Sequence, residues 1–418
     1  MDVQDERATT ATIDFDHTSN AHAQVWPATY HALRDGCPHG WTESHGGYWV
    51  ATRYNDILEV AQSSAIATEK VYDAETCQWR GGNVIPPLPV QPVLPVEAGN
   101  DAWRSYRSFL NRRFSPTMAA SHRPIASSVA RSLIDRVIET GTLDFVDDLT
   151  NPVPAIVTMK MFGFETANWM DFAEPIHRAM YYRPDNPGFG EVVSKLAGIS
   201  DWIMSAAVDR RQNPTDDLMS YIANGEVDGR PLTPDEVVQM SINIIFGGVD
   251  TTTALTSNIV RYLGRNPEQR QRLIDDPALR PIAREESLRY FAPVHGVARH
   301  STEDVEVGGF NIKAGDSIFL ALASANRDSA IFEAPDEFKV DRRPNRHLGF
   351  GAGMHHCIGQ HLARVMFDSM LDEVLNRIPD YVMGDGAEPY TSVDKVNGWI
   401  SLPATFTPGK KLGGGMDL

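Results

Sequence analysis

The pattern of apolar and polar positions predicts one unusually long helix. Thr233 and Glu236 are spaced as a capping box around Pro234, and no helix breaker follows until Asn266 and Pro267. The stretch between them is roughly 30 residues, which corresponds to about 45 Å of helix. Its centre, INIIFGGVDTTTA, is apolar on nearly every face, as in helices that are buried on all sides. We therefore expect a helix that crosses the interior of the molecule.

Shorter patterns complete a mainly helical chain. Residues 48–52 predict a strand, and residues 54–62 predict a helix. The region 101–276 is mostly helical by pattern, whereas residues 304–323 alternate with paired glycines as a small antiparallel sheet does. The expected fold class is therefore mainly α with a small antiparallel β region.

The two ends of the chain lack such patterns. Residues 1–25 show no period and are predicted to form an irregular arm, followed by a short helix that starts at Trp26 and ends near Gly36. Residues 407–418 are predicted to be a loose tail. Residues 26–406 are then expected to form one domain.

A proline-rich segment interrupts this domain at residues 81–95. Its five prolines exclude a regular helix or a central strand. Such a segment is either a functional loop or a linker between domains. We favour a loop that lies on the domain, because no charge run or repeat flanks it.

Composition and charge disfavour several classes of function. The 418 residues include 38 Lys and Arg against 55 Asp and Glu, a net charge of −17, which opposes binding to nucleic-acid phosphates because that binding needs clustered basic side chains. The N-terminus lacks the basic and apolar regions of a signal peptide, and no uncharged apolar run approaches the roughly 18 residues that cross a bilayer. We expect a cytoplasmic protein. Its three cysteines imply no disulfide framework.

The centre of the long helix contains residues that are costly in a protein core. Gly247 and Gly248 each cost about 1 kcal/mol in a helix relative to alanine, and Asp250 and Thr251 add polar groups. The glycines would let a flat group approach the backbone, and the Thr251 hydroxyl can bond the carbonyl four residues earlier and bend the helix. An Asp–Thr pair there could relay protons. The alternative is a helix crossing at the glycines, with Asp250 in a salt bridge elsewhere.

A second chemical signal is the sequence FGAGMHHCIG at residues 350–359, just before a helical pattern. Gly351 and Gly353 allow a tight turn whose amides can point at one atom, and Cys357 would lie near the helix N-terminus, where the dipole favours a thiolate. A haem iron needs such a thiolate on its proximal side when an O–O bond is cleaved, and Gly359 would let the helix approach a flat ligand. The alternative is a buried structural cysteine. Zinc is disfavoured, because no second pair of closely spaced ligands accompanies the nearby histidines.

A third pattern joins a helix to the segment before this cysteine. Glu286 and Arg289 stand three residues apart and share a helix face. Arg342 could join them in a buried network. Alone, such a pair is weak evidence, because similar pairs are frequent on solvated faces.

In this order and spacing, GGVDTT, Glu286-x-x-Arg289, the pattern FEAPDEFKVDR at 332–342 and FGAGMHHCIG resemble the cytochrome P450 family of haem-thiolate monooxygenases. The resemblance spans about residues 26–406. It implies a single triangular, mostly helical domain and a b-type haem whose iron is ligated by Cys357. It also implies oxygen activation beneath the long helix.

The resemblance also assigns roles to single residues. Asp250 and Thr251 are the expected catalytic pair, which organises proton delivery to the distal oxygen. Residues that match the family's haem and propionate contacts are Trp103, Arg107, Gly247, Gly248, Arg299, Phe350, His355 and Gly359. Arginine suits a buried carboxylate because its hydrogen bonds are charge-assisted. A core tryptophan and surface arginines are the alternative interpretation.

Offsets from the same motifs indicate a pocket for a small to medium-sized, largely apolar substrate. Its expected lining residues are Asn243, Phe246, Val294, Val297 and Ile400, with part of segment 72–95 as a lid. His295 lies in the segment that usually lines this pocket. We expect His295 to face a loop, with a substrate contact as the alternative.

The resemblance to the soluble bacterial members implies a monomer that receives electrons from a separate ferredoxin or flavodoxin and its NAD(P)H-dependent reductase. Basic residues near elements expected on the thiolate side would form a docking face on an acidic protein. They are Arg112, Arg113, Arg346 and Arg364. Ordinary solvated charge is the alternative.

The expected reaction inserts one oxygen atom from O2 into a C–H bond or a double bond. A haem-thiolate peroxygenase or isomerase, which needs no electron partner, is one alternative. A non-catalytic haem sensor is another. The intact Asp–Thr pair argues against both.

Overall fold

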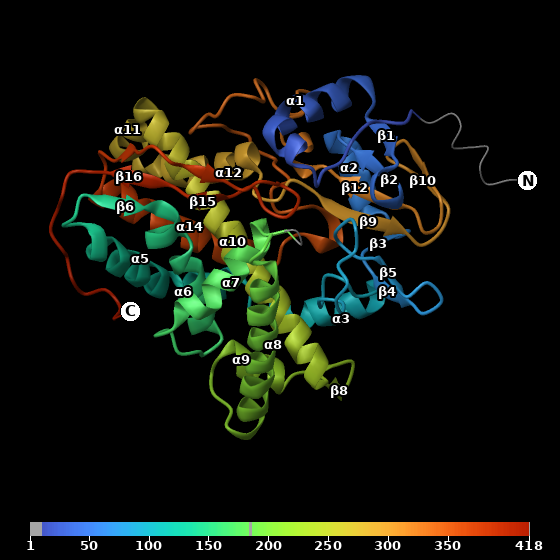
Figure 1. Cartoon of the computed structure of the whole chain (residues 1–418), viewed down its shortest axis with the longest axis horizontal. Coiled ribbons are helices and arrows are strands. Elements are labelled where there is room, and N and C mark those ends of the chain that lie inside the picture. Colours follow the sequence, from blue (N-terminus) through green and yellow to red (C-terminus); the bar gives the residue numbers. More distant parts are fainter. Residues whose placement is uncertain (1–10, 184–185, 418) are drawn as a thin grey trace, which may run out of the picture.

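The predicted long helix runs through the interior of a mostly helical, roughly triangular molecule (Figure 1). A computed structural model describes residues 11–183 and 186–417. The helix, α10, spans Pro234–Arg265. The Glu236 amide donates a hydrogen bond to the Thr233 hydroxyl, and the Thr233 amide donates one to the Glu236 carboxylate. The capping box is therefore present and fixes where the helix begins.

The other helices surround α10 or cover the sheet region. They are α1 (Asn20–Gly36), α2 (Tyr54–Gln62), α3 (Asn100–Asn111), α4 (Pro116–Ser121), α5 (Arg123–Val137), α6 (Pro152–Met161), α7 (Trp169–Tyr181), α8 (Phe189–Gln212), α9 (Leu218–Ala223), α11 (Pro267–Asp275), α12 (Arg280–Phe291), α13 (Leu322–Ala325) and α14 (Gln360–Arg377), with short helical turns η2 (Ser44–Gly46), η3 (Val146–Thr150), η4 (Pro277–Leu279) and η5 (Gly353–His355). Helices α6, α7, α8, α9, α12 and α14 all contact α10. The largest apolar cluster of the protein lies among these helices.

Short strands complete the fold. They are β1 (His39–Thr42), β2 (Tyr48–Ala51), β3 (Ile66–Ala67), β4 (Lys70–Asp73), β5 (Gln78–Gly81), β6 (Thr142–Asp144), β7 (Glu226–Val227), β8 (Arg230–Pro231), β9 (Val297–Ser301), β10 (Val305–Val307), β11 (Phe310–Ile312), β12 (Ser317–Leu320), β13 (Val382–Met383), β14 (Glu388–Pro389), β15 (Trp399–Ser401) and β16 (Pro403–Thr405). Five of them form one sheet in the order β1-β2-β12-β9-β3. This sheet lies to one side of α10, near α1 and α2 (Figure 1).

The segment predicted as one small antiparallel sheet, 304–323, contributes to two sheets. Strands β10 and β11 pair only with each other, whereas β12 lies between β2 and β9 and runs parallel to β2. Ile318 and Leu320 pack into one apolar cluster, and Phe319 between them packs into another. Burial on both faces therefore draws β12 into the larger sheet.

The N-terminal segment is more ordered than predicted. Helix α1 begins at Asn20 instead of Trp26, because the Ser19 hydroxyl accepts a hydrogen bond from the His22 amide and caps the helix. Ahead of it, the Ile13 amide donates to the Trp41 carbonyl at the edge of the sheet. Residues 1–10 of the predicted arm lie outside the described residues.

The C-terminal tail is irregular but attached. Residues 407–417 form no helix or strand, yet the Leu412 and Gly413 amides donate to the Asp135 carboxylate on α5. The predicted loose tail is thus held by a carboxylate that sequence patterns do not single out. Leu418 lies outside the described residues. Within the described part of the chain, no helix has both the length and the apolar composition needed to cross a membrane.

Two buried histidines lie where α1 packs on the chain before β9. Among the described residues, neither ring nitrogen of His22 or of His295 has a hydrogen-bond partner. The His295 ring lies edge-on to Trp26, with centroids 4.4 Å apart, so this histidine packs against a helix and not against a loop. The expectation for His295 was wrong because the packing of α1 on the chain before β9 joins residues far apart in the sequence. Burial lowers the pKa of His22 to about 4 and the pKa of His295 well below its usual range.

We predict that these rings make the fold sensitive to acid. An unfolded histidine binds a proton below about pH 6.5, whereas folded His22 does so only near pH 4. The unfolded state therefore binds more protons between these values, and the free energy of unfolding falls as pH falls through this window. His22→Phe should reduce that loss by up to about 3 kcal/mol, measured as urea midpoints between about pH 7 and pH 4. Exposed His31 on the same helix provides the control, His31→Phe; an unaltered pH dependence in His22→Phe would contradict the prediction.

Candidate active site

The cysteine loop directly precedes α14 and points amides at the sulfur. The amides of Gly359 and Gln360, where α14 begins, hydrogen-bond to Cys357, and the Cys357 amide donates to the Phe350 carbonyl over 2.9 Å. Gly353 has a φ of +66°, and a Cβ there would lie 2.0 Å from the carbonyl oxygen of Ala61 on α2. Only glycine fits this turn.

Opposing effects act on the Cys357 thiol. Burial raises its pKa, and the Gly359 and Gln360 amides and the charges of Arg107 and Arg364 only partly offset that increase. A metal cation at the sulfur would reverse the balance, because a coordinating thiol is deprotonated outright. The site therefore suits a metal-bound thiolate better than an isolated reactive one.

Basic side chains without a carboxylate partner converge beside this loop. Arg299 is buried and donates a hydrogen bond to the carbonyl of Ala298, while Arg107 donates to the His356 carbonyl. Burial, followed by the charges of Arg299 and Arg107, lowers the pKa of His355 to about 3. Among the described residues, no carboxylate pairs with either arginine. Uncompensated buried charge is unfavourable, so this cluster fits a bound dianion.

The predicted haem partner Trp103 belongs to the same cluster. Its ring lies 5.0 Å from the His355 ring and 5.7 Å from the Arg107 guanidinium. The His355 Nδ1 is buried and has no partner among the described residues. These side chains fit the two propionates of a haem, which supply the missing negative charge.

The middle of α10 has one accessible face. Gly247 is exposed although Ile245 and Val249 beside it are buried, and a Cβ at Gly247 would have no atom within 4 Å. The Thr251 hydroxyl, on the same face, donates to the Gly247 carbonyl over 2.8 Å. Gly248 lies nearer to α6, where a Cβ would meet Thr158 at 3.6 Å. A flat group can thus approach the helix backbone at Gly247.

Asp250 and Thr251 have different partners. Asp250 is fully buried and accepts hydrogen bonds from His177 Nδ1 over 2.6 Å and from the Tyr390 hydroxyl over 3.0 and 3.1 Å. No hydrogen bond joins Asp250 to Thr251 within the described part of the chain. Asp250 is thus held by side chains on other segments, as in the salt-bridge alternative, and the Asp–Thr proton relay stays a prediction. Sequence reasoning did not identify His177 or Tyr390, because they lie far from Asp250 in the chain and belong to no motif.

Glu286 holds the segment that leads into the cysteine loop. It is fully buried and accepts hydrogen bonds from Arg289, 2.7 Å away, and from Arg342, 2.9 Å away. The Lys339 amide and the Asn345 side chain donate to the same carboxylate. A buried charge with this many donors is satisfied, so α12 and residues 339–345 keep one relative position.

The predicted substrate-pocket residues lie on α10, on the chain around β9 and on β15. All five, Asn243, Phe246, Val294, Val297 and Ile400, are only partly buried. Ile400 packs against the cluster of Ala254, Tyr390 and Val396. The expected lid begins with the β4–β5 hairpin and continues as irregular chain.

The predicted docking arginines differ in how they are engaged. Arg112 and Arg346 are exposed. Arg113 contacts Asp216 over 3.3 Å and lies over the Tyr221 ring. Arg364 is hydrogen-bonded to Glu285 over 2.8 Å and lies over the Phe350 ring. The first two are the side chains with most freedom to meet a partner.

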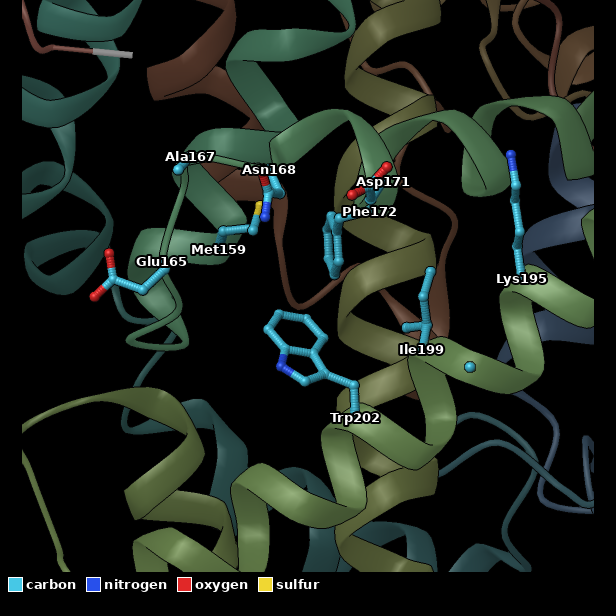
Figure 2. Close-up of a pocket in the computed structure, with 10 residues that line it drawn as sticks. Met159, Glu165, Ala167, Asn168, Asp171, Phe172, Lys195, Ile199 and Trp202 are labelled. Carbon is cyan, nitrogen blue, oxygen red and sulfur yellow. The ribbon is translucent and has the colours of Figure 1, made fainter.

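A separate cavity of about 490 Å³ lies between α6, α7 and α8 (Figure 2). Phe172 and Trp202 line it with their rings edge to face, centroids 6.0 Å apart, and Glu165 and Lys195 lie on opposite sides. Lys195 is paired with Glu174 and Glu191. None of the predicted site residues lines this cavity, so it is not part of the candidate active site.

We predict that Cys357 is the axial ligand of the haem iron. Cys357→Ser should abolish the strongly red-shifted Soret band of the reduced carbon monoxide complex, because an alcohol does not replace the thiolate. The matched controls are Cys37→Ser and Cys77→Ser, at the other unpaired cysteines. Retention of the band in Cys357→Ser, with its loss in a control, would show that the ligand lies elsewhere.

Comparisons with known proteins agree with this geometry. The family model described as Cytochrome P450 matches residues 283–378, which include the Glu286 network and the cysteine loop. The Steroid C26-monooxygenase of Mycobacterium tuberculosis strain H37Rv is 34% identical over 390 residues, 91% of this chain and 98% of the relative. The Cyclomarin C epoxidase CymV of Salinispora arenicola is 31% identical over 376 residues, 86% of this chain and 90% of that one.

Among solved structures, a mutant of P450 EryK in complex with erythromycin B has a TM-score of 0.82 and 26% identity to this chain, covering 95% of it and all of the EryK chain. The likeness thus extends over the whole fold and is not confined to the cysteine loop. Haem b is the cofactor of the cytochrome P450 family, and the thiol, the basic cluster and the accessible glycine described above fit it. By sequence, fold and cofactor site, this chain belongs to the cytochrome P450 family of haem-dependent monooxygenases.

Proposed function

We propose that this enzyme inserts one oxygen atom from O2 into a C–H bond or a double bond of a small to medium-sized, largely apolar substrate. Electrons come from a separate redox partner. The observation that carries the proposal is the Thr251 hydroxyl beside the accessible backbone of Gly247, with the Asp250 carboxylate buried on the same helix. A haem bound through Cys357 supplies the oxygen-activating chemistry.

In this proposal Thr251 and Asp250 handle the protons of the reaction. The bond from Thr251 to the Gly247 carbonyl holds the hydroxyl at the accessible face of α10. The apolar helix interior excludes bulk water, so fixed polar groups must deliver protons. Asp250, next to Thr251 in the chain and fully buried, is the nearest group that can carry one between cycles.

The lining side chains and the relatives support an apolar substrate. Phe246, Val294, Val297 and Ile400 are apolar and partly exposed, and Asn243 is the polar exception. Two relatives are named for a steroid and for cyclomarin C. By analogy with these relatives, either hydroxylation or epoxidation fits this site. The apolar side chains favour recognition of the substrate through apolar contacts and not through charge.

We predict that Thr251→Ala separates reductant consumption from product formation. Without the Thr251 hydroxyl, proton delivery in the active site is no longer ordered. Hydrogen peroxide should therefore form, and the amount of product per NAD(P)H consumed should fall by about tenfold or more. Product, hydrogen peroxide and consumed NAD(P)H are measured in parallel. The substrate used is one that changes the haem spectrum from low spin to high spin when it binds. Thr252→Ala, which removes a buried hydroxyl that has no hydrogen-bond partner in the described part of the chain, should remain coupled. Full coupling in Thr251→Ala would mean that another group delivers the protons.

The electron donor is proposed to be an acidic ferredoxin or flavodoxin that docks on basic side chains near the cysteine loop. Exposed Arg112 follows α3, and exposed Arg346 precedes the loop. Opposite charges on the two surfaces would steer the encounter. Arg364 and Arg113 already have acidic neighbours, so they contribute less.

We predict that Arg112→Glu with Arg346→Glu slows reduction by an acidic ferredoxin by about tenfold at low ionic strength, because charge steering is lost. Added salt should slow reduction of the wild-type enzyme and so decrease the difference in rate between the wild type and the variant. The first electron transfer is followed by stopped-flow absorbance. The control for overall charge reverses two arginines elsewhere, Arg265→Glu with Arg136→Glu, in the last turns of α10 and α5; equal slowing in that control would remove the docking hypothesis.

A further inference from the structure

Three titratable side chains meet behind the proposed proton-delivering pair. Asp250 of α10, His177 of α7 and Tyr390 after β14 are 0%, 6% and 4% exposed. The Tyr390 hydroxyl lies 3.0 Å from His177 Nδ1 and donates to the Asp250 carboxylate. Asp250 therefore has no direct route to solvent, and any proton it gains must come through a neighbour.

The tyrosine is not that source. Burial and the Asp250 charge raise its pKa well above the usual range, so the hydroxyl remains protonated and acts only as a donor. Histidine is the side chain whose ordinary titration falls near neutrality. His177 is the remaining neighbour of the Asp250 carboxylate and, as an imidazole, can carry a proton on either ring nitrogen.

The two ring nitrogens of His177 have different surroundings. Nδ1 lies 2.6 Å from the Asp250 carboxylate, close enough for a short charge-assisted hydrogen bond. Nε2, on the other side of the ring, is buried and has no hydrogen-bond partner within residues 11–183 and 186–417. An unsatisfied nitrogen on the far side of the ring from Asp250 can bind a proton. The His177 side chain is 7% exposed whereas that of Asp250 is 0% exposed, so the ring is the member of this pair that reaches solvent.

Other ionisable groups around the ring come from α7 itself and from the elements packed on it. Burial, and then the Asp144 charge, raise the pKa of Asp147 of η3, and the nearby His177 charge partly offsets that increase. The Tyr181 ring lies 5.5 Å from the His177 ring. On the neighbouring turns, Glu174 and Arg178 pair with each other, and Lys395 donates to the Ala179 carbonyl. Asp147 and Asp250 are thus the carboxylates that interact with the ring.

We propose that His177 holds the Asp250 carboxylate and exchanges its proton with solvent, an inference that rests on the proposed role of Asp250. The imidazolium gives its Nδ1 proton to the Asp250 carboxylate, which leaves a neutral ring with its hydrogen on Nε2 and a neutral carboxylic acid. Asp250 then passes the proton towards Thr251. A half-turn of the ring then brings the protonated Nε2 to Asp250 and turns the unprotonated Nδ1 away from it. Nδ1 takes up a new proton from solvent. No electrons move, and one proton crosses per cycle.

In this account His177 is a positioning residue, because it acts on the reaction only through Asp250. The first test is nuclear magnetic resonance of the ferrous carbon monoxide holoenzyme labelled with 15N-histidine. His177 should carry a proton on Nδ1 and titrate, and its apparent pKa should fall by about one unit in Asp250→Asn, which removes the anion. A hydrogen held only on Nε2, or a titration unchanged in Asp250→Asn, would overturn the proposal.

The second test is the pH profile of turnover in His177→Gln. Glutamine keeps a donor near Asp250 but does not titrate, so turnover should fall by about tenfold near neutral pH and lose its pH dependence there, whereas a purely structural role would leave the profile unchanged. Tyr181→Phe, beside the ring but not bonded to Asp250, is the matched control. If Thr251→Ala still converted all consumed NAD(P)H into product, the proposed function would be wrong, but the resonance result for His177 would not change. Failure of the proposed function and failure of the His177 proposal can therefore be told apart.

Discussion

The polar groups at the centre of α10 must be satisfied inside an apolar core, and much of the molecule is arranged around that requirement. Asp250 takes its donors from α7 and from the chain after β14. Two turns later, Ser257 hydrogen-bonds to Thr150 of η3, and Asn258 donates to the Asn397 carbonyl. Because a buried polar group without a partner is costly, these bonds fix distant segments at defined places along one helix. The same helix then presents Gly247 and Thr251 to the active site.

The two charged clusters near the cysteine loop differ in whether the chain itself supplies the groups that neutralise them. Glu286 has donors for its whole carboxylate, so its network is complete within the chain. Arg107 and Arg299 have no such partner in the described part of the chain, and burial lowers the pKa of Arg299 to about 10. The first cluster stabilises the fold on its own, whereas the second is stabilised when an anion binds. Haem binding and folding stability are therefore coupled through the propionate site.

Local signals made several elements predictable. Thr233 and Glu236 cap α10 through contacts within one turn, and glycine at 353 is required by a positive φ that the sequence spacing already suggested. Other features depended on contacts across the chain. The early start of α1 needs its Ser19 cap, but the helix is held in place by packing of Tyr30 in an apolar cluster with residues far along the sequence. Strand β12 likewise joins a sheet whose other members were not recognised as its neighbours.

The residues of the candidate site also divide into those that local patterns identify and those that only contacts across the chain bring together. The sequence by itself determined the cysteine turn, the Asp–Thr pair and the Glu–Arg spacing, because each is a short-range pattern whose chemistry follows from residue type and helical or turn geometry. Only the tertiary structure decided that Asp250 is held by His177 and Tyr390, that His295 packs against α1, and that Arg364 is bonded to Glu285. These pairings join residues far apart in the chain. Their energies depend on burial and on distance in space, which local sequence patterns do not encode.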